Sequence, residues 1–460
     1  MSPPCVVHPK TASPKLSADS QRLAALAQAT IQAASRLEER NWERSLDAAV
    51  HKLLKANHQD AIDHTLDHLF ATDLDAYDAL MESAEAVSES CSIEHDGAAY
   101  DALLIAAPVL AWTRFSIASG AIPTDMLHTL SAHLSAHLLA PGTRLAMAPH
   151  LFSIDQLPHN HAEAFVLTQR MAQTALKDGV VRASAHPAQT VPFLADTRYL
   201  LAVIAAPAGT PLFRWQGVTN PLDANTERDH ALQQWRDQAT PNLAKLLPGC
   251  GVELLLPEAY YVACREADKQ IRPASIRAAV HFLTHTLSVA PVDLRAIIGG
   301  FGDPATQEGI EEYRIGFTLR QSDTVAYGIV WPLYGQEDAE EELRAMATVG
   351  AATPGAATTA IPATPIEEIL GLLHEAGVVH IKNHQERFPM EFCDDCGAPL
   401  FADADGELVH PEMPEDAPPG HAAFPLIVCG AVQSWIVLPT TGNSVAPANA
   451  GAQWRIAHQE

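Results

Sequence analysis

The spacing of apolar residues predicts helices near the start of the chain. One stripe at helical spacing comprises Leu23, Leu26, Ile31, Ala34 and Leu37. Two further stripes follow after short polar breaks. They comprise Leu46, Val50, Leu53 and Leu54, and then Ile62, Leu66 and Leu69. Short breaks favour antiparallel neighbours, so we predict an array of helices that reaches about Ser90.

The pattern then changes to compact apolar runs. "YDALLIAAPVLAW" and "TRLAMAP" predict buried strands, and "TDMLHTLSAHLSAHLLA" between them has helical spacing. "RYLLAVIAAPAGTPLFRWQ" contains a proline and glycine interruption and predicts a hairpin. Together these segments predict a unit of mixed α/β structure.

The same order of elements returns downstream. "VELLLPEAYYVA" predicts a strand, "PASIRAAVHFLTHTLSV" a helix, "DLRAIIGGF" a strand and "EYRIGFTLRQSDTVAYGIVWP" a hairpin. Residues of the same type also fall at matching places in the two segments. They are Pro123 and Pro273 at the helix start, Pro141 and Pro291 after the helix, Tyr199 and Tyr313 at the hairpin start, and Trp215 and Trp331 at its end. Prolines are well tolerated at helix starts and after helix ends. We therefore predict an internal duplication.

These patterns divide the chain into seven parts and predict the α/β (α+β) class. "GQEDAEEELRAMATVGAATPGAATTAIPATPIEE" lacks the residues that fill a core and is typical of a linker. "IEEILGLLHEAGVVHI" predicts one amphipathic helix that runs toward two cysteines. The expected parts are a disordered start (1–16), a helical region (17–99), two α/β units (100–218 and 219–335), a linker (336–364), a helix with a zinc-knuckle segment (365–425) and a poorly patterned tail (426–460).

The stretch "FCDDCGAPLFADADGELVH" contains the strongest chemical motif. Cys393 and Cys396 are two residues apart and are followed by Gly, so both thiolates could reach one metal ion from a tight turn. His410 and His421 are the nearest candidates for the two remaining ligands of a structural zinc site. Two alternatives for these ligands stay open, Cys429 downstream and His384 upstream.

A redox pair is the competing interpretation of the two cysteines. A pair of the thioredoxin type would lie between a strand and a helix start. The residues that follow, "GAPLFADADGELV", instead predict a hairpin, as in zinc ribbons. The pattern therefore favours structural zinc.

The other histidines do not form a convincing metal motif. His133 and His137 are four residues apart on a predicted helix, as are His64 and His68, but no catalytic Glu accompanies them. In the second α/β unit, leucines stand at the places of His133 and His137, which indicates partly buried helix positions. His159 and His161 are expected in a loop.

Composition narrows the function classes. The chain has 29 Lys and Arg against 55 Asp and Glu, so its net charge is −26, which disfavours binding to phosphate backbones and to anionic lipid. The seven cysteines are mostly far apart, which fits reduced thiols. "MSPPCVVHPKTASPK" lacks the features of a signal peptide, and we expect a cytoplasmic protein. Loops that bind nucleotide phosphates, hydrolase nucleophile elbows and His-Glu-x-x-His motifs do not occur. "IIGGFGDPA" with Gly300 and Gly302 is read as a plain turn.

Several stretches together resemble a known family. They are "SRLEERNWE", "ALLIAAPVLAWTRFSI", "SIDQLP", "LLLPEAYYVACREAD", "EYRIGF" and "EFCDDCGAPLFADADGELVH". They resemble an uncharacterised family known mainly from beta-proteobacteria, domain of unknown function 2863, from about Ser35 to about Ala417. The resemblance implies no activity and assigns no catalytic residue.

The function expected from the sequence is non-catalytic: a cytoplasmic binding or assembly protein with a structural zinc knuckle. Its partner would be an unknown protein or small ligand, and neither nucleic acid nor membrane. The alternative is an enzyme that acts on a small molecule at the cleft between the two α/β units.

Overall fold

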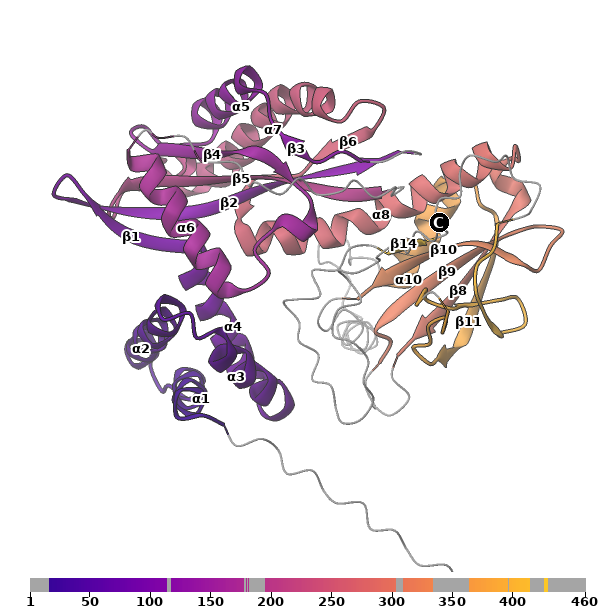
Figure 1. Ribbon diagram of the computed structural model, residues 1–460, viewed down its shortest axis with the longest axis horizontal. Helices are drawn as coiled ribbons and strands as arrows, with labels where there is room; N and C mark the ends of the chain where they lie inside the picture. The colour runs from indigo at the N-terminus through magenta and orange to yellow at the C-terminus, as the bar shows by residue number, and fades with distance from the viewer. Residues whose placement is uncertain are drawn as a thin grey trace, which may run out of the picture.

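The computed structural model describes residues 16–113, 117–177, 179, 181, 195–302, 309–333, 364–395, 397–413 and 426–428. The predicted disordered start (1–16) lies outside these residues except for residue 16, and the predicted linker (336–364) except for residue 364. Of the predicted tail, only 426–428 are described. The described part is a mixed α/β structure built around two sheets (Figure 1). No helix among these residues combines the length and the apolar character needed to cross a membrane.

Four helices form the predicted N-terminal array. They are α1 (Ala18–Ile31), α2 (Arg36–Lys55), α3 (Gln59–Thr72) and α4 (Leu74–Glu89). The side chains of Ser17, Ser35 and Asp73 accept backbone N–H groups at the starts of α1, α2 and α4. The stripe predicted from Leu23 to Leu37 is wrong, because α1 ends at Ile31 and Leu37 is 79% exposed in α2.

The first sheet is antiparallel and has the order β1-β2-β5-β4-β3. β2 also pairs with β6 and β7, beyond the end of β1. Asp96 and Gly97 both have positive φ in the turn between β1 and β2, which suits a tight hairpin. The strands are β1 (Ser90–His95), β2 (Ala98–Trp112), β3 (Gly120–Ala121), β4 (Arg144–Phe152), β5 (Ala195–Pro207), β6 (Gly251–Leu254) and β7 (Glu258–Ala259).

Helices cover both faces of this sheet. α5 (Thr124–His137) and α7 (Pro221–Leu246) pack on one face. The core on this face includes Leu134 and Trp235 of the helices and Ile105 and Leu200 of the sheet. α6 (His161–Leu176) and the first half of α8 (Tyr260–Thr286) pack on the other face. Alternate residues of β2 and β5 point to the two faces, so both strands read as continuous apolar runs.

The second sheet has the order β11-β8-β9-β10-β14. Its strands are β8 (Leu294–Phe301), β9 (Glu312–Leu319), β10 (Val325–Pro332), β11 (His380–Phe388) and β14 (Leu426–Val428). The second half of α8 and helix α10 (Pro365–Glu375) cover one face. The hairpin of β12 (Phe401–Ala402) and β13 (Leu408–Val409) covers the other face, where the Phe401 ring lies against Gly328.

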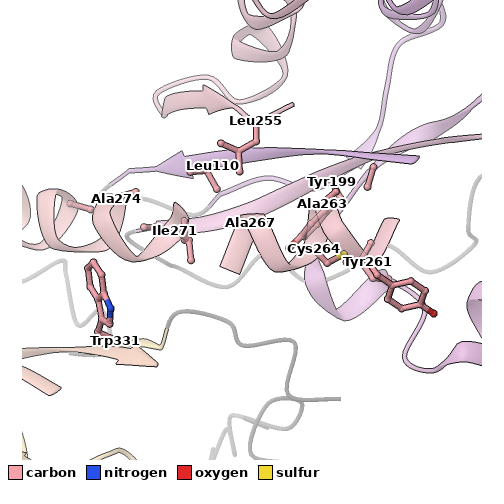
Figure 2. Packing of buried hydrophobic residues seen from close by; sticks show 14 of the residues in the cluster. Leu110, Tyr199, Leu255, Tyr261, Ala263, Cys264, Ala267, Ile271, Ala274 and Trp331 are labelled. Carbon is pink, nitrogen blue, oxygen red and sulfur yellow. The ribbon is translucent and has the colours of Figure 1, made fainter. Parts of the chain in front are cut away.

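Helix α8 joins the two sheets into one core. Figure 2 shows Tyr261, Cys264 and Ala267 of α8 beneath the first sheet, and Ile271 and Ala274 above Trp331 of the second. The space between the predicted α/β units is therefore filled by buried side chains at this place.

Pro273 lies inside α8 and does not open a helix. Proline has no N–H to bond the carbonyl four residues earlier, which is that of Lys269. The Arg272 Nε–H donates to this carbonyl at 3.2 Å, and Arg272 Nη1 donates to the Pro332 carbonyl at 2.7 Å. Its guanidinium also lies 5.0 Å from the centre of the Trp331 ring. Arg272 thus compensates for the proline and ties α8 to the end of β10.

Further predictions also need correction. β5 runs without a second hairpin strand after it, and Trp215 lies in the short 3-10 helix η2 (Arg214–Gly217), whereas Trp331 lies in β10. The predicted strand "VELLLPEAYYVA" ends at Ala259, where α8 begins. Its strands pair with β2, so the second unit has no strand of its own at this place. The proposed matches at Pro273 and Trp215 are therefore wrong, and the duplication is not confirmed.

Near the cysteines, the predicted continuous helix is wrong and the predicted hairpin is confirmed. α10 ends at Glu375, Gly377 follows with φ 86°, and β11 then begins at His380, so one continuous helix toward the cysteines is wrong. The hairpin predicted after the cysteines is confirmed by the antiparallel pair of β12 and β13. The β9–β10 hairpin is confirmed as well.

Candidate metal knuckle

The loop from Glu391 to Leu400, here called the knuckle loop, is closed by its own backbone. The Cys393 N–H donates to the Ala398 carbonyl at 2.7 Å, and the Gly397 N–H donates to the Cys393 carbonyl at 2.7 Å. The Leu400 N–H donates to the Glu391 carbonyl at 3.1 Å. Gly397 has φ 71°, the left-handed conformation for which the sequence motif predicted a glycine.

The predicted ligands are only partly visible in this loop. Cys393 is half-buried. Cys396 and His421 lie outside the described residues, as does the alternative Cys429. His410 follows β13 and is half-buried. Across the described ranges, no three His, Cys, Asp or Glu side chains gather closely enough to hold a metal ion. The zinc site therefore stays a prediction.

The alternative ligand His384 is engaged elsewhere. It lies in β11 with its Nε2 2.8 Å from the Asp403 carbonyl, so Nε2 is the donor. Its Nδ1 lies 3.8 Å from Glu386 Oε1, and its ring packs edge-on against Phe388. These contacts hold the turn of the β12–β13 hairpin against β11.

Arg314 of β9 fastens both ends of the knuckle loop to the second sheet. Its Nη1 donates to the Glu391 carbonyl at 2.8 Å and to the Leu400 carbonyl at 2.7 Å. Its guanidinium lies 4.3 Å from the Phe301 ring centre and 5.1 Å from that of Phe392. The shape of the loop is therefore set by a side chain from the centre of the sheet.

Glu312 supplies the charge partner of Arg314. Glu312 Oε1 lies 2.6 Å from Arg314 Nε, and the Arg314 side chain is fully buried. Burial raises the pKa of Glu312 against the opposing effect of Arg314, and burial lowers the pKa of Arg314. Desolvation thus works against both charges, and the two carbonyl contacts are part of what compensates.

The first sheet contains the same arrangement. Arg198 in β5 is 2.5 Å from Asp196 through Nη1, and it donates to the carbonyls of Ile117 at 2.6 Å and Ala118 at 2.9 Å. β5 and β9 are each the middle strand of their sheet, and the residue after each arginine faces α8. Neither arginine belongs to a motif that the sequence patterns indicated. Both arginines do share a local pattern, Asp or Glu two residues before Arg, at the start of an apolar run.

A partly buried carboxylate, Glu89, lies where the helical array meets α8. The Glu89 carboxylate, at the end of α4, accepts the Tyr261 N–H at 3.0 Å and so caps α8, whose own N-cap residue is Ala259. Burial raises the pKa of Glu89 to about 7. One turn earlier on α4, Glu85 pairs with Arg265 of α8. These contacts anchor the array to the sheet.

His133, His137 and His159 lie where the sequence predicted them, and His161 does not. The rings of His133 and His137 stack 6.1 Å apart on α5, both half-buried. His161 does not lie in a loop but begins α6, and its burial lowers its pKa to about 4. Its Nδ1 lies 3.2 Å from Gln59 Nε2 of α3. The histidine therefore links α6 to the helical array.

A small hollow lies between α1 and α2. It has a volume of about 90 Å³ and is lined by Asp19, Arg22 and Lys52 together with apolar residues. Sites for small organic ligands usually have a volume of several hundred Å³. The hollow therefore suits water better than a substrate.

Comparison with protein families gives a match over most of the chain. The family described as "Protein of unknown function (DUF2863)" matches residues 8–424. Neither curated proteins nor solved structures give a match.

Proposed function

The chain belongs to the DUF2863 family of proteins of unknown function, and on this premise we propose that it is a non-catalytic binding or assembly protein with a structural zinc knuckle. Zinc would be held by Cys393 and Cys396 with His410 and His421. A closed site with four protein ligands stabilises a fold and leaves no position for substrate.

The observation that carries this proposal is the closed backbone of the knuckle loop. The two 2.7 Å hydrogen bonds around Cys393 and the left-handed Gly397 give the turn that a Cys-x-x-Cys-Gly knuckle requires. Arg314 fixes this turn on the sheet without using the thiol. These contacts support a turn from which the Cys393 sulfur would reach a metal ion.

A binding role is supported further by the packing between the sheets. The alternative function needed an open cleft between the two α/β units. At this place Ile271, Ala274 and Trp331 belong to one buried core. We expect the partner to be a protein or small ligand, because a net charge of −26 disfavours nucleic acid and anionic membranes.

Metal analysis of the purified full chain tests the zinc component. We expect about one zinc per chain, the content of a single structural knuckle, and its loss in Cys393→Ser and Cys396→Ser. Cys250→Ser is the matched control, since Cys250 is also half-buried but lies before β6. Metal-free wild-type protein with both knuckle thiols open to titration would sink the zinc proposal.

An activity screen tests the binding component. Hydrolase, transferase and oxidoreductase substrates would be offered to the zinc-loaded chain. We expect no turnover. Robust turnover that disappears when one residue is replaced, in a variant that remains folded, would establish the enzyme instead.

A further inference from the structure

We infer that β1, the outer strand of the first sheet, pairs with β1 of a second copy of this chain, so that the two sheets become continuous across a two-fold axis. This inference rests on the proposed assembly role and is independent of the zinc site. Among the described residues, β1 pairs with β2 alone and forms the outer edge of the sheet (Figure 1). The row of backbone N–H and C=O groups along such an edge fits another extended chain.

β1 lacks the features that protect the other described edge strands of the two sheets. β3, β6, β7 and β14 have only two to four residues each. β11 is longer, but it carries Lys382 and Arg387, its pairing with β8 shifts in register, and Lys382 and His384 contact the β12–β13 turn. Short strands, charged side chains and register shifts all keep edges from pairing. β1 instead has six residues in unbroken register with β2, and neither lysine nor proline.

The β1–β2 turn determines which backbone groups of β1 point outward. His95 and Ala98 flank a two-residue turn in which Asp96 and Gly97 both have positive φ. In such a hairpin the flanking residues exchange both backbone hydrogen bonds, and bonding then alternates along the strand. Every second residue before His95 therefore bonds β2, and the residues between them point their N–H and C=O groups away from it.

The free outward groups belong to Ser92 and Glu94. Ser90 is the third residue of this set, and its N–H donates to the Ala86 carbonyl of α4 instead of to β2, which agrees with the alternation. The side chains of Ser92 and Glu94 are exposed, whereas Ile93 between them is half-buried against the core. A second β1 can therefore bond Ser92 and Glu94 without displacing a backbone hydrogen bond of the described residues.

A two-fold axis at Ile93 brings the free groups of two copies together. Ser92 of each copy then lies opposite Glu94 of the other, and each of these pairs exchanges both backbone hydrogen bonds. Ile93 of one copy lies opposite Ile93 of the other, which extends the apolar face of the sheet. A hydroxyl faces a carboxylate in both outer pairs, so no like charges are opposed although each chain has a net charge of −26. The strand is therefore complementary to itself.

The test is the molar mass of the full-length protein, measured by light scattering during gel filtration on samples shown to be folded by circular dichroism. We expect the wild type to have twice the mass of one chain. Ser92→Glu opposes like charges in both outer pairs and should give the mass of one chain. Adding Glu94→Lys to Ser92→Glu places opposite charges there and should restore the dimer. Ser92→Ala is the matched control and should stay dimeric, because it keeps every backbone group.

A monomeric wild type, or a dimer that Ser92→Glu leaves intact, would overturn the inference. A second substitution that fails to restore the dimer would contradict the pairing of Ser92 with Glu94. Zinc content is measured separately, so each of these results leaves the knuckle proposal unaffected.

Hydrogen exchange gives a second measurement that does not depend on a variant's folding. Within a single chain, the amide of Ile93 bonds β2, whereas those of Ser92 and Glu94 point outward. We expect all three amides of the wild type to be protected from exchange, because the second copy accepts the outward pair. Protection of Ile93 alone would show that no strand covers this edge and would contradict the inference.

Discussion

Arg198 and Arg314 occupy the same position in two different sheets. Each lies near the start of the middle strand, two residues after its carboxylate partner, and each donates to two carbonyls of a neighbouring loop. Both side chains are almost completely buried. The shared device fastens a loop near residue 117 in one sheet and the knuckle loop in the other.

Removal of either arginine should strongly destabilise the protein. Arg198→Ala and Arg314→Ala each leave a largely buried carboxylate without its charge partner and two carbonyls without that donor. We expect each to lower the free energy of unfolding by about 3–5 kcal/mol in urea titrations. Arg36→Ala is the control, since Arg36 forms ion pairs while 60% exposed, and it should leave the free energy of unfolding nearly unchanged. A small effect at both buried arginines would contradict this account of the sheets.

Arg272 and Pro273 should be energetically coupled. Arg272→Met removes the donor to the Lys269 carbonyl that Pro273 leaves without a helical partner. In a Pro273→Ala background, the alanine N–H can bond that carbonyl, so the loss of Arg272 should cost about 1 kcal/mol less. A double-mutant cycle of urea unfolding measures the difference. Strict additivity would show that Arg272 does not compensate for the proline.

Glu89 should make stability depend on pH. Its pKa is about 7 in the folded protein against 4.5 for the free side chain, because it is buried between α4 and α8. A raised acid pKa favours the folded state at low pH, so this contribution is full below about pH 4.5. As pH rises through 7 this contribution is lost, and the free energy of unfolding falls by up to about 3 kcal/mol.

Glu89→Gln should remove this part of the pH dependence while still accepting the Tyr261 N–H. Unfolding free energies from pH 4.5 to 8 would be compared with those of Glu94→Gln, on the exposed edge of β1, which should keep the wild-type slope. An unchanged slope in Glu89→Gln would refute the assignment.

Gly328 should be irreplaceable beneath the β12–β13 hairpin. An added Cβ would lie 2.3–2.5 Å from atoms of the Phe401 ring, so Gly328→Ala must displace the hairpin and should cost about 1–3 kcal/mol. Gly371→Ala is the opposite control, because a Cβ there meets nothing within 4 Å inside α10. It should stabilise by about 0.5–1 kcal/mol. Thermal unfolding of the two variants would move in opposite directions.

Local patterns predicted helices and strands well where one face of the element is buried along its whole length. The stripes in α2 and α3 and the strand from Ala98 follow directly from apolar spacing. α7 was missed because its apolar residues are sparse among charged ones, and its burial depends on the sheet beneath it. Pro273 indicated a helix start because proline is rare inside helices. The Arg272 contact that makes it tolerable inside α8 cannot be recognised from residue spacing.

Only the turn that carries the cysteines could be predicted from the sequence. The spacing of the cysteines and the glycine at 397 indicated the turn, because these depend on neighbouring residues. Arg314 lies 77 residues before Glu391 in the chain and reaches it only through the pairing of the strands. Long-range contacts of this kind leave no local pattern.

X-ray absorption at the zinc edge of the purified, full-length protein tests the central claim most directly. The proposed knuckle predicts a first shell of two sulfur atoms at about 2.3 Å and two nitrogen atoms at about 2.0–2.1 Å. The sulfur contribution should be absent in Cys393→Ser. Zinc surrounded only by oxygen and nitrogen in the wild type, or a wild-type protein without zinc, would contradict the claim.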